Sequence, residues 1–505
     1  MRPAVWILLV LLLCSLAPTA LPAAAPPAAP AASGGPVPEA PGLAVIQRAD
    51  LMRTVEYLAS KDLEGRLAGS PGFMTAARQM ADRFRLLHLE PGGEDGYFEK
   101  LNIEYDEIQA CSLALVRRDG SRHAFRLGPD FVARGFTGSG DFTAPVVFAG
   151  YGLSRPASGY DDYAGLDVHG KVVLAFKEAP PFKADTTGWG DSTLPRPKGL
   201  VAAAHGAVGL LLVSRPRQAE PQKPIGSTLE GEGTEDERFP RLQLDVAAAQ
   251  ELARGAGLDL GEAQARIDST HAPASRELGD SVRVIVRASY HPQQPSVNVV
   301  AILRGADPRL AGQCVVVGAH LDHVGSQAGE IYFPGANDNA SGAASVQAIA
   351  AAFARTGVRP RRTVIFALFS SEEAGLFGSK RFVARPPVPL DSIVAYLNLD
   401  CVGHGDSIQV GGGKSYPRLW RMAHDLDSAG AKLLVEATWP GGGADAAPFQ
   451  EHQIPNLYFA SRPSYTHLHL TTDTPATLNP ALLESIARLA YQTAWKLAQE
   501  GVPKE

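Results

Sequence analysis

Short apolar runs alternate with helical stretches between residues 296 and 400, and most of these runs stop at an ionisable side chain. The runs CVVVGAH, RRTVIFALFS and IVAYLNLD are rich in Val, Ile, Leu and Phe, and residues 341–356 and 374–384 have helical spacing. Continuous apolar strands separated by helices predict a mixed, mostly parallel sheet that is covered by helices on both faces. We therefore predict an α/β fold for this part of the chain.

The ionisable side chains at the strand ends would meet at one rim of such a sheet. His320, Glu372, Glu373 and Asp400 lie at or just past the ends of three predicted strands. In open α/β sheets, ligands bind outside the carboxyl ends of the strands. We therefore expect these side chains to form one functional site.

The types of side chain at this rim are typical of a metal site. Asp338 of GANDNASG adds a carboxylate, and His467 or His469 of YTHLHLTTDT adds a second imidazole. Nitrogen and oxygen ligands without thiolates suit Zn²⁺, with Co²⁺ or Mn²⁺ as substitutes. Three carboxylates in one pocket would repel each other unless cations neutralised them, and two divalent ions sharing one carboxylate would do so. Each motif alone also fits a polar turn or a helix start, so the inference depends on their combination.

The same motifs resemble those of the M28 family of zinc peptidases, the dizinc aminopeptidase and glutamate-carboxypeptidase-like group. HLDHVG, GANDNASG, SSEEAGLFGS, LNLDCVG and HLTTDT occur in family order and with family-like spacing over about residues 296–500. The resemblance implies the zinc-dependent exopeptidase (phosphorylase/hydrolase-like) fold and two Zn²⁺ ions per chain. It also implies a peptide or a small protein as the substrate.

The resemblance assigns a metal-binding role to five residues. Asp338 would bridge the two ions. His320 and Asp400 would complete one metal site, and Glu373 and His469 would complete the other.

Two further acids would support the reaction. The resemblance implies that Glu372 is the general base, which takes a proton from the attacking water and passes it to the departing amine. Asp322, two residues after His320, would accept the imidazole N–H and fix the tautomer of that ring.

The choice between the two neighbouring histidines depends on their spacing to an acid. Family members place the ligand four residues before an Asp, and His469 with Asp473 fits this spacing. In an extended segment His467 would point the same way, so it remains the alternative ligand. His323 is expected to line the pocket or to form a hydrogen bond rather than to bind metal.

One motif departs from the family pattern. Family members often have Ser-Asp before a polar or aromatic residue near 441–455, whereas Ala444 and Ala446 flank Asp445 here. The polar contact usually supplied by that loop is therefore not expected, and Tyr465 is either a substitute for it or a packing residue.

The predicted function is that of a dizinc exopeptidase, and specifically an aminopeptidase. The alternatives are a carboxypeptidase or a cyclase that uses the same metals, or a non-catalytic binding module. An aminopeptidase needs an acid that holds the substrate ammonium, whereas a carboxypeptidase needs an arginine for the carboxylate. Glu436 and Arg462 are candidates for these roles, and the sequence does not discriminate between them.

The two ends of the chain and its middle differ in composition. Arg2, the run AVWILLVLLL and an Ala-x-Ala site at 23–25 predict a secretory signal, and so a secreted or periplasmic protein without a stable membrane span. An uncleaved membrane anchor is the alternative. VVFAGYG and DYAGLDVHGKVVL resemble a protease-associated (PA) domain, which is β-rich. The predicted organisation is a signal peptide (1–25), a Pro/Ala-rich linker (26–46), a first peptidase part (47–140), a PA-like insert (141–291) and a second, metal-binding peptidase part (292–505).

Charge, cysteine content and one polar segment give three smaller expectations. The net charge is -6 and no Lys/Arg-rich run is present, so no nucleic-acid partner is expected. Of the four cysteines, Cys14 lies in the predicted signal peptide; the remaining Cys111, Cys314 and Cys401 are odd in number and scattered, which does not indicate a disulfide framework. Residues 215–239 are polar without an apolar period, and we expect them at the surface, as an irregular excursion or as a functional loop.

Overall fold

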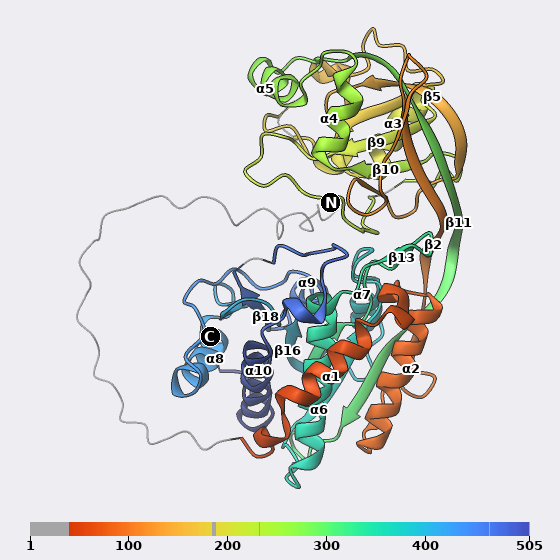
Figure 1. Cartoon of the computed structure of the whole chain (residues 1–505). Helices are drawn as coiled ribbons and strands as arrows, with labels where there is room; N and C mark the ends of the chain where they lie inside the picture. The colour runs from red at the N-terminus through yellow and green to blue at the C-terminus, as the bar shows by residue number, and fades with distance from the viewer. Residues whose placement is uncertain (1–39, 184–187, 232, 464, 504–505) are drawn as a thin grey trace, which may run out of the picture.

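The computed structural model describes residues 40–183, 188–231, 233–463 and 465–503, and Figure 1 shows two lobes that are joined by a pair of long strands. The predicted signal peptide (1–25) and the first part of the predicted linker lie outside the described residues. The core of the larger first lobe includes both Ile46 and Ala498, so the two ends of the described chain belong to this lobe.

A mixed, mostly parallel sheet forms the centre of the first lobe, which confirms the predicted fold class. Four strands run parallel in its middle, with antiparallel partners on either side, in the order β17-β18-β16-β12-β15-β11. Successive residues of β12 face opposite layers, because Val315 and Val317 belong to one core cluster and Val316 to another. The strand bounds are β11 (Arg276–Leu303), β12 (Cys314–His320), β15 (Thr363–Phe369), β16 (Ile393–Leu399), β17 (Ser407–Gly411) and β18 (Asn456–Arg462).

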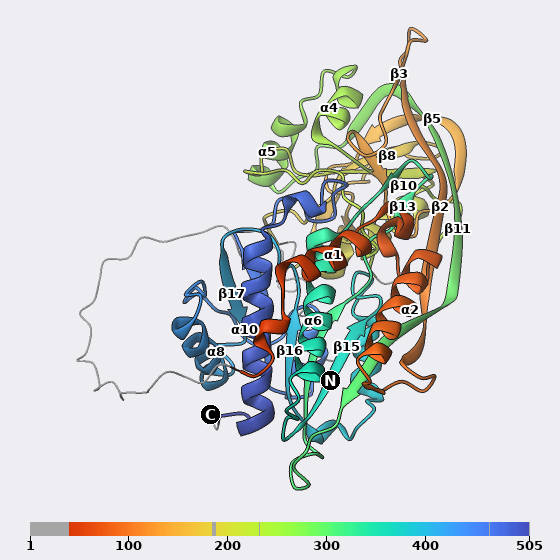
Figure 2. The same cartoon turned by 60° about the horizontal axis from the view of Figure 1, so that its bottom comes forward.

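Helices cover both faces of this sheet, as the predicted apolar strands require. The thicker layer, seen in front of the sheet in Figure 2, shares one core cluster with β12 and β15. It consists of α1 (Arg48–Leu58), α2 (Pro71–Leu86), α6 (Gly342–Arg355), α8 (Pro417–Ala429) and α10 (Pro480–Glu500). The opposite face packs against α7 (Phe377–Ala384) and α9 (Ala446–Glu451) through Phe382 and Phe449.

The second lobe has its own sheet and its own core. Parallel strands β5, β8, β9 and β10 are flanked by β4, which is antiparallel to β10. Helices α4 and α5 pack on one face and α3 on the other, so this lobe is not purely β-structured. The bounds are β4 (Phe131–Ala133), β5 (Gly140–Phe148), β8 (Val172–Phe176), β9 (Gly209–Val213), β10 (Arg241–Leu244), α3 (Pro195–Ala204), α4 (Val246–Arg254) and α5 (Leu260–Thr270).

Two long strands run through both lobes. β2 (Phe98–Val116) pairs with β11 along its whole length, and β11 pairs with β15 in the first lobe and with β5 in the second. Cys111 and Phe131 already belong to the core of the second lobe. The second lobe therefore begins before Cys111 and not at residue 141, because an unbroken strand carries no turn signal where one lobe ends and the next begins.

The structure adds three observations on the ends, the thiols and the helices. Residues 40–46, which the composition assigned to the linker, instead lie on the first lobe, with Ile46 fully buried. The cysteines at 111, 314 and 401 are free. Among the described helices, none combines the length and the apolar character that crossing a membrane requires.

Candidate metal centre

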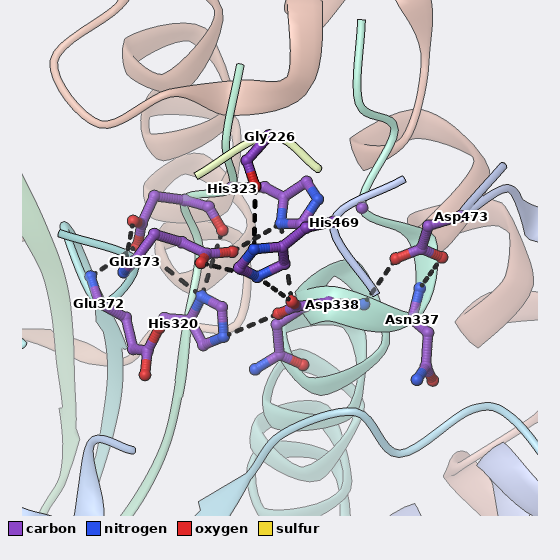
Figure 3. A network of polar contacts seen from close by, with 12 residues as sticks. Gly226, His320, His323, Asn337, Asp338, Glu372, Glu373, His469 and Asp473 are labelled. Carbon is purple, nitrogen blue, oxygen red and sulfur yellow. Dashed lines mark hydrogen bonds and ion pairs between the residues drawn. The ribbon is translucent and has the colours of Figure 1, made fainter. Parts of the chain in front are cut away.

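The loops at the carboxyl end of the first-lobe sheet bring the predicted residues together, as Figure 3 shows for His320, Asp338, Glu372, Glu373 and His469. His320 ends β12, and Asp400 follows β16 directly. Glu372 and Glu373 lie in the turn after β15, and Asp338 lies in the irregular turn Ala336–Ser341 before α6. His469 comes from the loop between β18 and α10.

The first group of ligand atoms consists of His320, Asp338 and Asp400, whose candidate atoms lie within 4.8 Å of one another. His320 Nε2 is 3.2 Å from Asp338 Oδ1 and 3.4 Å from Asp400 Oδ1. The hydroxyl of Tyr458 donates to the other oxygen, Asp400 Oδ2, at 2.7 Å. This hydrogen bond leaves Oδ1 as the oxygen of Asp400 that faces the group.

The second group consists of His469, Asp338, Glu373 and His323. His469 Nε2 is 3.1 Å from Asp338 Oδ2 and 2.9 Å from Glu373 Oε2. His323 Nδ1 lies 2.7 Å from the other oxygen, Glu373 Oε1, so this ring orients Glu373 through a hydrogen bond. His467 contacts Thr472 instead and belongs to neither group.

The chemistry of these side chains fits a pair of divalent cations. Every donor is an imidazole nitrogen or a carboxylate oxygen, which are ligands that zinc accepts. Asp400 Oδ1 and His323 Nε2 are buried without a hydrogen-bond partner, a costly arrangement unless another group satisfies them. Asp338 offers one oxygen to each group, as a bridging ligand would.

Hydrogen bonds and neighbouring charges keep two of the candidate ligand carboxylates ionised. Burial disfavours the charge on Asp338, but hydrogen bonds from His320 and His469 outweigh burial and hold its pKa well below the usual range. Burial acts on Glu373 in the same way, and the opposite charge of His469 lowers its pKa to about 2. An ionised carboxylate is the form that binds a metal ion.

The neighbouring acid, Glu372, is in a different environment. Burial raises its pKa well above the ordinary value, and the charge of Glu373 adds to this effect although His320 opposes it. Figure 3 shows its side chain beside His320, and no described residue donates a hydrogen bond to its carboxylate. Two adjacent acids with pKa values shifted in opposite directions are suited to different roles, one as a ligand and one as a proton carrier.

Asp322 lies beside His320, as the sequence led us to expect, and also contacts the two glutamates. His320 Nδ1 is 3.2 Å from the main-chain carbonyl of Asp322 and 3.8 Å from its carboxylate oxygen Oδ1, so the carbonyl is the nearer acceptor. The carboxylate also accepts the backbone N–H groups of Glu372 at 3.2 Å and Glu373 at 3.4 Å. Burial raises the pKa of Asp322 to about 7. Asp322 therefore holds the turn that carries both glutamates.

Asp473 was used in the sequence analysis only to choose between His467 and His469. In the structure it stabilises the turn that carries Asp338. It accepts the backbone N–H groups of Asn337 at 2.8 Å and Asp338 at 3.1 Å. The hydroxyl of Tyr465 donates to the same carboxylate, so Tyr465 supports the turn.

Two residues considered for substrate binding are exposed, whereas the acid of the motif that departs from the family pattern is buried. Glu436 is 80% exposed and pairs with His424, and Arg462 is exposed at the end of β18. Asp445 is fully buried, and burial raises its pKa to about 7, with the charge of His320 opposing this rise. The sequence did not indicate that Asp445 is close to the metal site. In the fold, the charges of His320 and Asp400 influence its pKa.

Within the polar segment 215–239, residues 224–230 contribute to the site, which agrees with the functional loop of the two alternatives, although this part is buried rather than at the surface. Ile225, Thr228 and Glu230 are buried, and Gly226 contacts His469. Burial is possible because Glu230 pairs with Arg134, whose side chain is 2% exposed. Polar composition alone indicates exposure, whereas paired charges can be buried.

Comparison with known proteins gives one family and several relatives. A model of peptidase family M28 matches residues 298–494. Leupeptin-inactivating enzyme 1 of Streptomyces exfoliatus is 38% identical over 181 residues, which are 34% of this chain and 36% of that protein. The probable glutamate carboxypeptidase AMP1 of Arabidopsis thaliana is 26% identical over 340 residues, which are 60% of this chain and 44% of that protein. The chain thus spans less than half the length of these curated relatives.

Solved structures share the fold over nearly the whole chain. The peptidase M28 precursor from Shewanella amazonensis has a TM-score of 0.65 at 17% identity and covers 92% of this chain and 98% of its own. The zinc aminopeptidase from Bacillus subtilis has a TM-score of 0.64 at 18% identity and covers 91% of this chain and 97% of its own. At these identities the likeness shows the fold alone.

Proposed function

We propose that this chain is a metal-dependent exopeptidase, and specifically an aminopeptidase that removes N-terminal residues from peptides, because a model of peptidase family M28 matches residues 298–494. One observation carries the proposal. Asp338 offers one carboxylate oxygen to each of two buried ligand groups, and the unpaired carboxylate of Glu372 lies beside them.

Two Zn²⁺ ions are the proposed cofactors, with Co²⁺ or Mn²⁺ as substitutes. His320, Asp338 and Asp400 would hold one ion, and Asp338, Glu373 and His469 would hold the other. Ions of this kind act as Lewis acids that polarise a carbonyl group and make water more acidic.

The residues of the chain supply the proton transfer. Glu372 takes a proton from the attacking water and returns it to the departing amine; burial raises its pKa above the ordinary value, which makes it a stronger base than an exposed glutamate. Asp322 keeps Glu372 and Glu373 in place through their backbone N–H groups. Glu373 can then point toward the other candidate ligands while Glu372 points toward the attacking water.

A cleft next to Glu372 favours the aminopeptidase over the carboxypeptidase. It is lined by Ser371 and Ala374 on either side of the glutamate pair and by Glu104 and Asp106 of β2. The described lining residues include no arginine or lysine; of the two acids of β2, Glu104 pairs with Arg196 at 3.1 Å and burial raises the pKa of Asp106 to about 8, so Glu104 is the acid that would carry a negative charge at neutral pH. Acids suit the ammonium group of an aminopeptidase substrate, whereas a substrate carboxylate requires a cation.

Glutamate carboxypeptidase activity is the second candidate, since a probable glutamate carboxypeptidase aligns with 60% of the chain. An assay with amino-acyl p-nitroanilides and their N-acetylated forms separates the two. We expect release from the free-amine substrate only, with loss of activity after chelation and recovery with Zn²⁺. Cleavage of a blocked C-terminal glutamyl peptide without cleavage of the free-amine substrate would instead favour the carboxypeptidase.

We further propose that the protein is exported to the periplasm or the medium and that its second lobe is a PA-like domain. The N-terminal signal pattern supports export, and VVFAGYG and DYAGLDVHGKVVL support the domain assignment. N-terminal sequencing of the protein from its native compartment should find a mature chain that begins near Pro26. An intact Met1 in the membrane fraction would favour the anchor.

A further inference from the structure

A short segment of the second lobe, residues 224–230, reaches across to the metal ligand His469. The backbone N–H of Gly226 donates to the carbonyl of His469 at 3.0 Å. In return, His469 Nδ1 lies 3.1 Å from the carbonyl of Gly226, as Figure 3 shows. Two hydrogen bonds therefore tie these residues, which are 243 positions apart in the chain.

This contact decides which nitrogen of His469 faces the ligand cluster. Nε2 points at Asp338 Oδ2 and Glu373 Oε2. Nδ1 faces a carbonyl oxygen, which only accepts hydrogen bonds, so Nδ1 must carry the proton. A second-sphere acceptor of this kind fixes the tautomer and the orientation of a metal-binding imidazole.

The second lobe holds the segment in place. Glu230 forms an ion pair with Arg134 at 2.8 Å, and both side chains are almost fully buried. The backbone N–H of Gly135 donates to the carbonyl of Ser227 at 2.9 Å, and that of Arg196 donates to the carbonyl of Glu230 at 2.8 Å. The position of the Gly226 carbonyl is therefore set by the second lobe.

Only a glycine fits where the segment meets the first lobe. A Cβ at position 226 would lie 2.6 Å from Cγ2 of Val324 and 3.1 Å from the ring of Phe333. The first of these distances is shorter than real Cβ contacts, so a side chain would push the segment away from His469 or displace Val324.

We propose that Gly226 is a positioning residue for His469, through which the second lobe controls how tightly the His469 metal site holds its ion. The inference rests on the proposed metallopeptidase function. Linkage makes the coupling reciprocal, because a contact that strengthens metal binding is itself strengthened by the metal.

The test compares zinc affinities of the full-length chain by competition with a chromophoric chelator. Gly226→Ala should weaken one of the two zinc constants by about 10- to 100-fold, the usual effect of losing a second-sphere partner, and leave the other unchanged. Val324→Ala in the same chain removes the clashing methyl groups and should restore the affinity, with Val324→Ala alone as the reference. Gly312→Ala is the matched control, because a Cβ there meets no atom within 4 Å.

Two results would overturn the inference. In the first, the Gly226→Ala variant binds both zinc ions as tightly as the wild type. In the second, it loses affinity for both ions equally, and adding Val324→Ala does not restore the affinity. If Gly226→Ala fails to fold, amide hydrogen exchange of the wild-type chain, measured with and without zinc, tests the inference instead. Zinc should slow exchange in residues 224–230, and unchanged exchange there would refute the coupling. A wild-type chain that binds no zinc would refute the proposed function itself, which separates the two failures.

Discussion

The Nε2 atom of His320 lies 3.2 Å from Oδ1 of Asp338, and the second oxygen of the same carboxylate faces His469 at 3.1 Å. One side chain thus belongs to both groups of candidate ligands. The two proposed ions would depend on each other through Asp338, whereas the remaining ligands each serve one ion.

Replacement of the shared carboxylate should therefore differ from replacement of an unshared one. We expect Asp338→Asn to retain neither ion and Asp400→Asn to lose only the ion near His320. Elemental analysis of the purified, folded variants measures this difference. Equal zinc contents in the two variants would contradict the bridging role.

Removal of the proposed proton carrier should abolish turnover without loss of metal. Glu372→Gln should lower kcat by about 10²- to 10⁴-fold, the usual contribution of a general base, while the zinc content stays at the wild-type value. Glu262→Gln, at an exposed acid of the second lobe, is the control and should keep full activity. Lost zinc with retained activity in Glu372→Gln would contradict the assignment.

The hydroxyl of Tyr458 should support one metal site. It donates to Asp400 Oδ2 at 2.7 Å, so Tyr458→Phe removes one second-sphere hydrogen bond. We expect one zinc constant to weaken by about 10-fold. Tyr396→Phe is the matched control, because its buried hydroxyl donates to Asn398 and not to a ligand. It should cost about 1 kcal/mol of stability without a change in zinc affinity.

A buried acid of β2 should make stability depend on pH. Burial, reinforced by the charge of Glu235, raises the pKa of Asp106 to about 8, whereas an unfolded Asp titrates near pH 4. The stability that its protonated form contributes is present below about pH 4 and is lost as the pH rises to about 8. Asp106→Asn should thus match the wild type near pH 4 and exceed it in thermal midpoint at pH 9.

The control for this pH effect is Asp141→Asn, at an exposed acid of the same lobe. Its midpoint should follow the wild type throughout the pH range. Parallel pH profiles for Asp106→Asn and the wild type would show that Asp106 titrates normally.

Local sequence patterns were sufficient to predict several central strands and helices of the first lobe, and the family resemblance supplied the candidate metal ligands that the structure brings together. The apolar run CVVVGAH corresponds to β12 (Cys314–His320), and the helix predicted at 341–356 corresponds to α6 (Gly342–Arg355). These elements are specified by neighbouring residues, and a parallel sheet necessarily collects the side chains that follow its strands.

Contacts between distant parts of the chain were decided by the tertiary structure alone. The carboxylate of Asp322, 3.8 Å from His320 Nδ1, also accepts two backbone N–H groups of the turn that carries Glu372 and Glu373. The polar segment 224–230 is buried because Arg134 neutralises Glu230, and it brings Gly226 to His469. The composition of a polar segment indicates exposure until its charge partners are known, and here the partner of Glu230 is set by the folding of the second lobe.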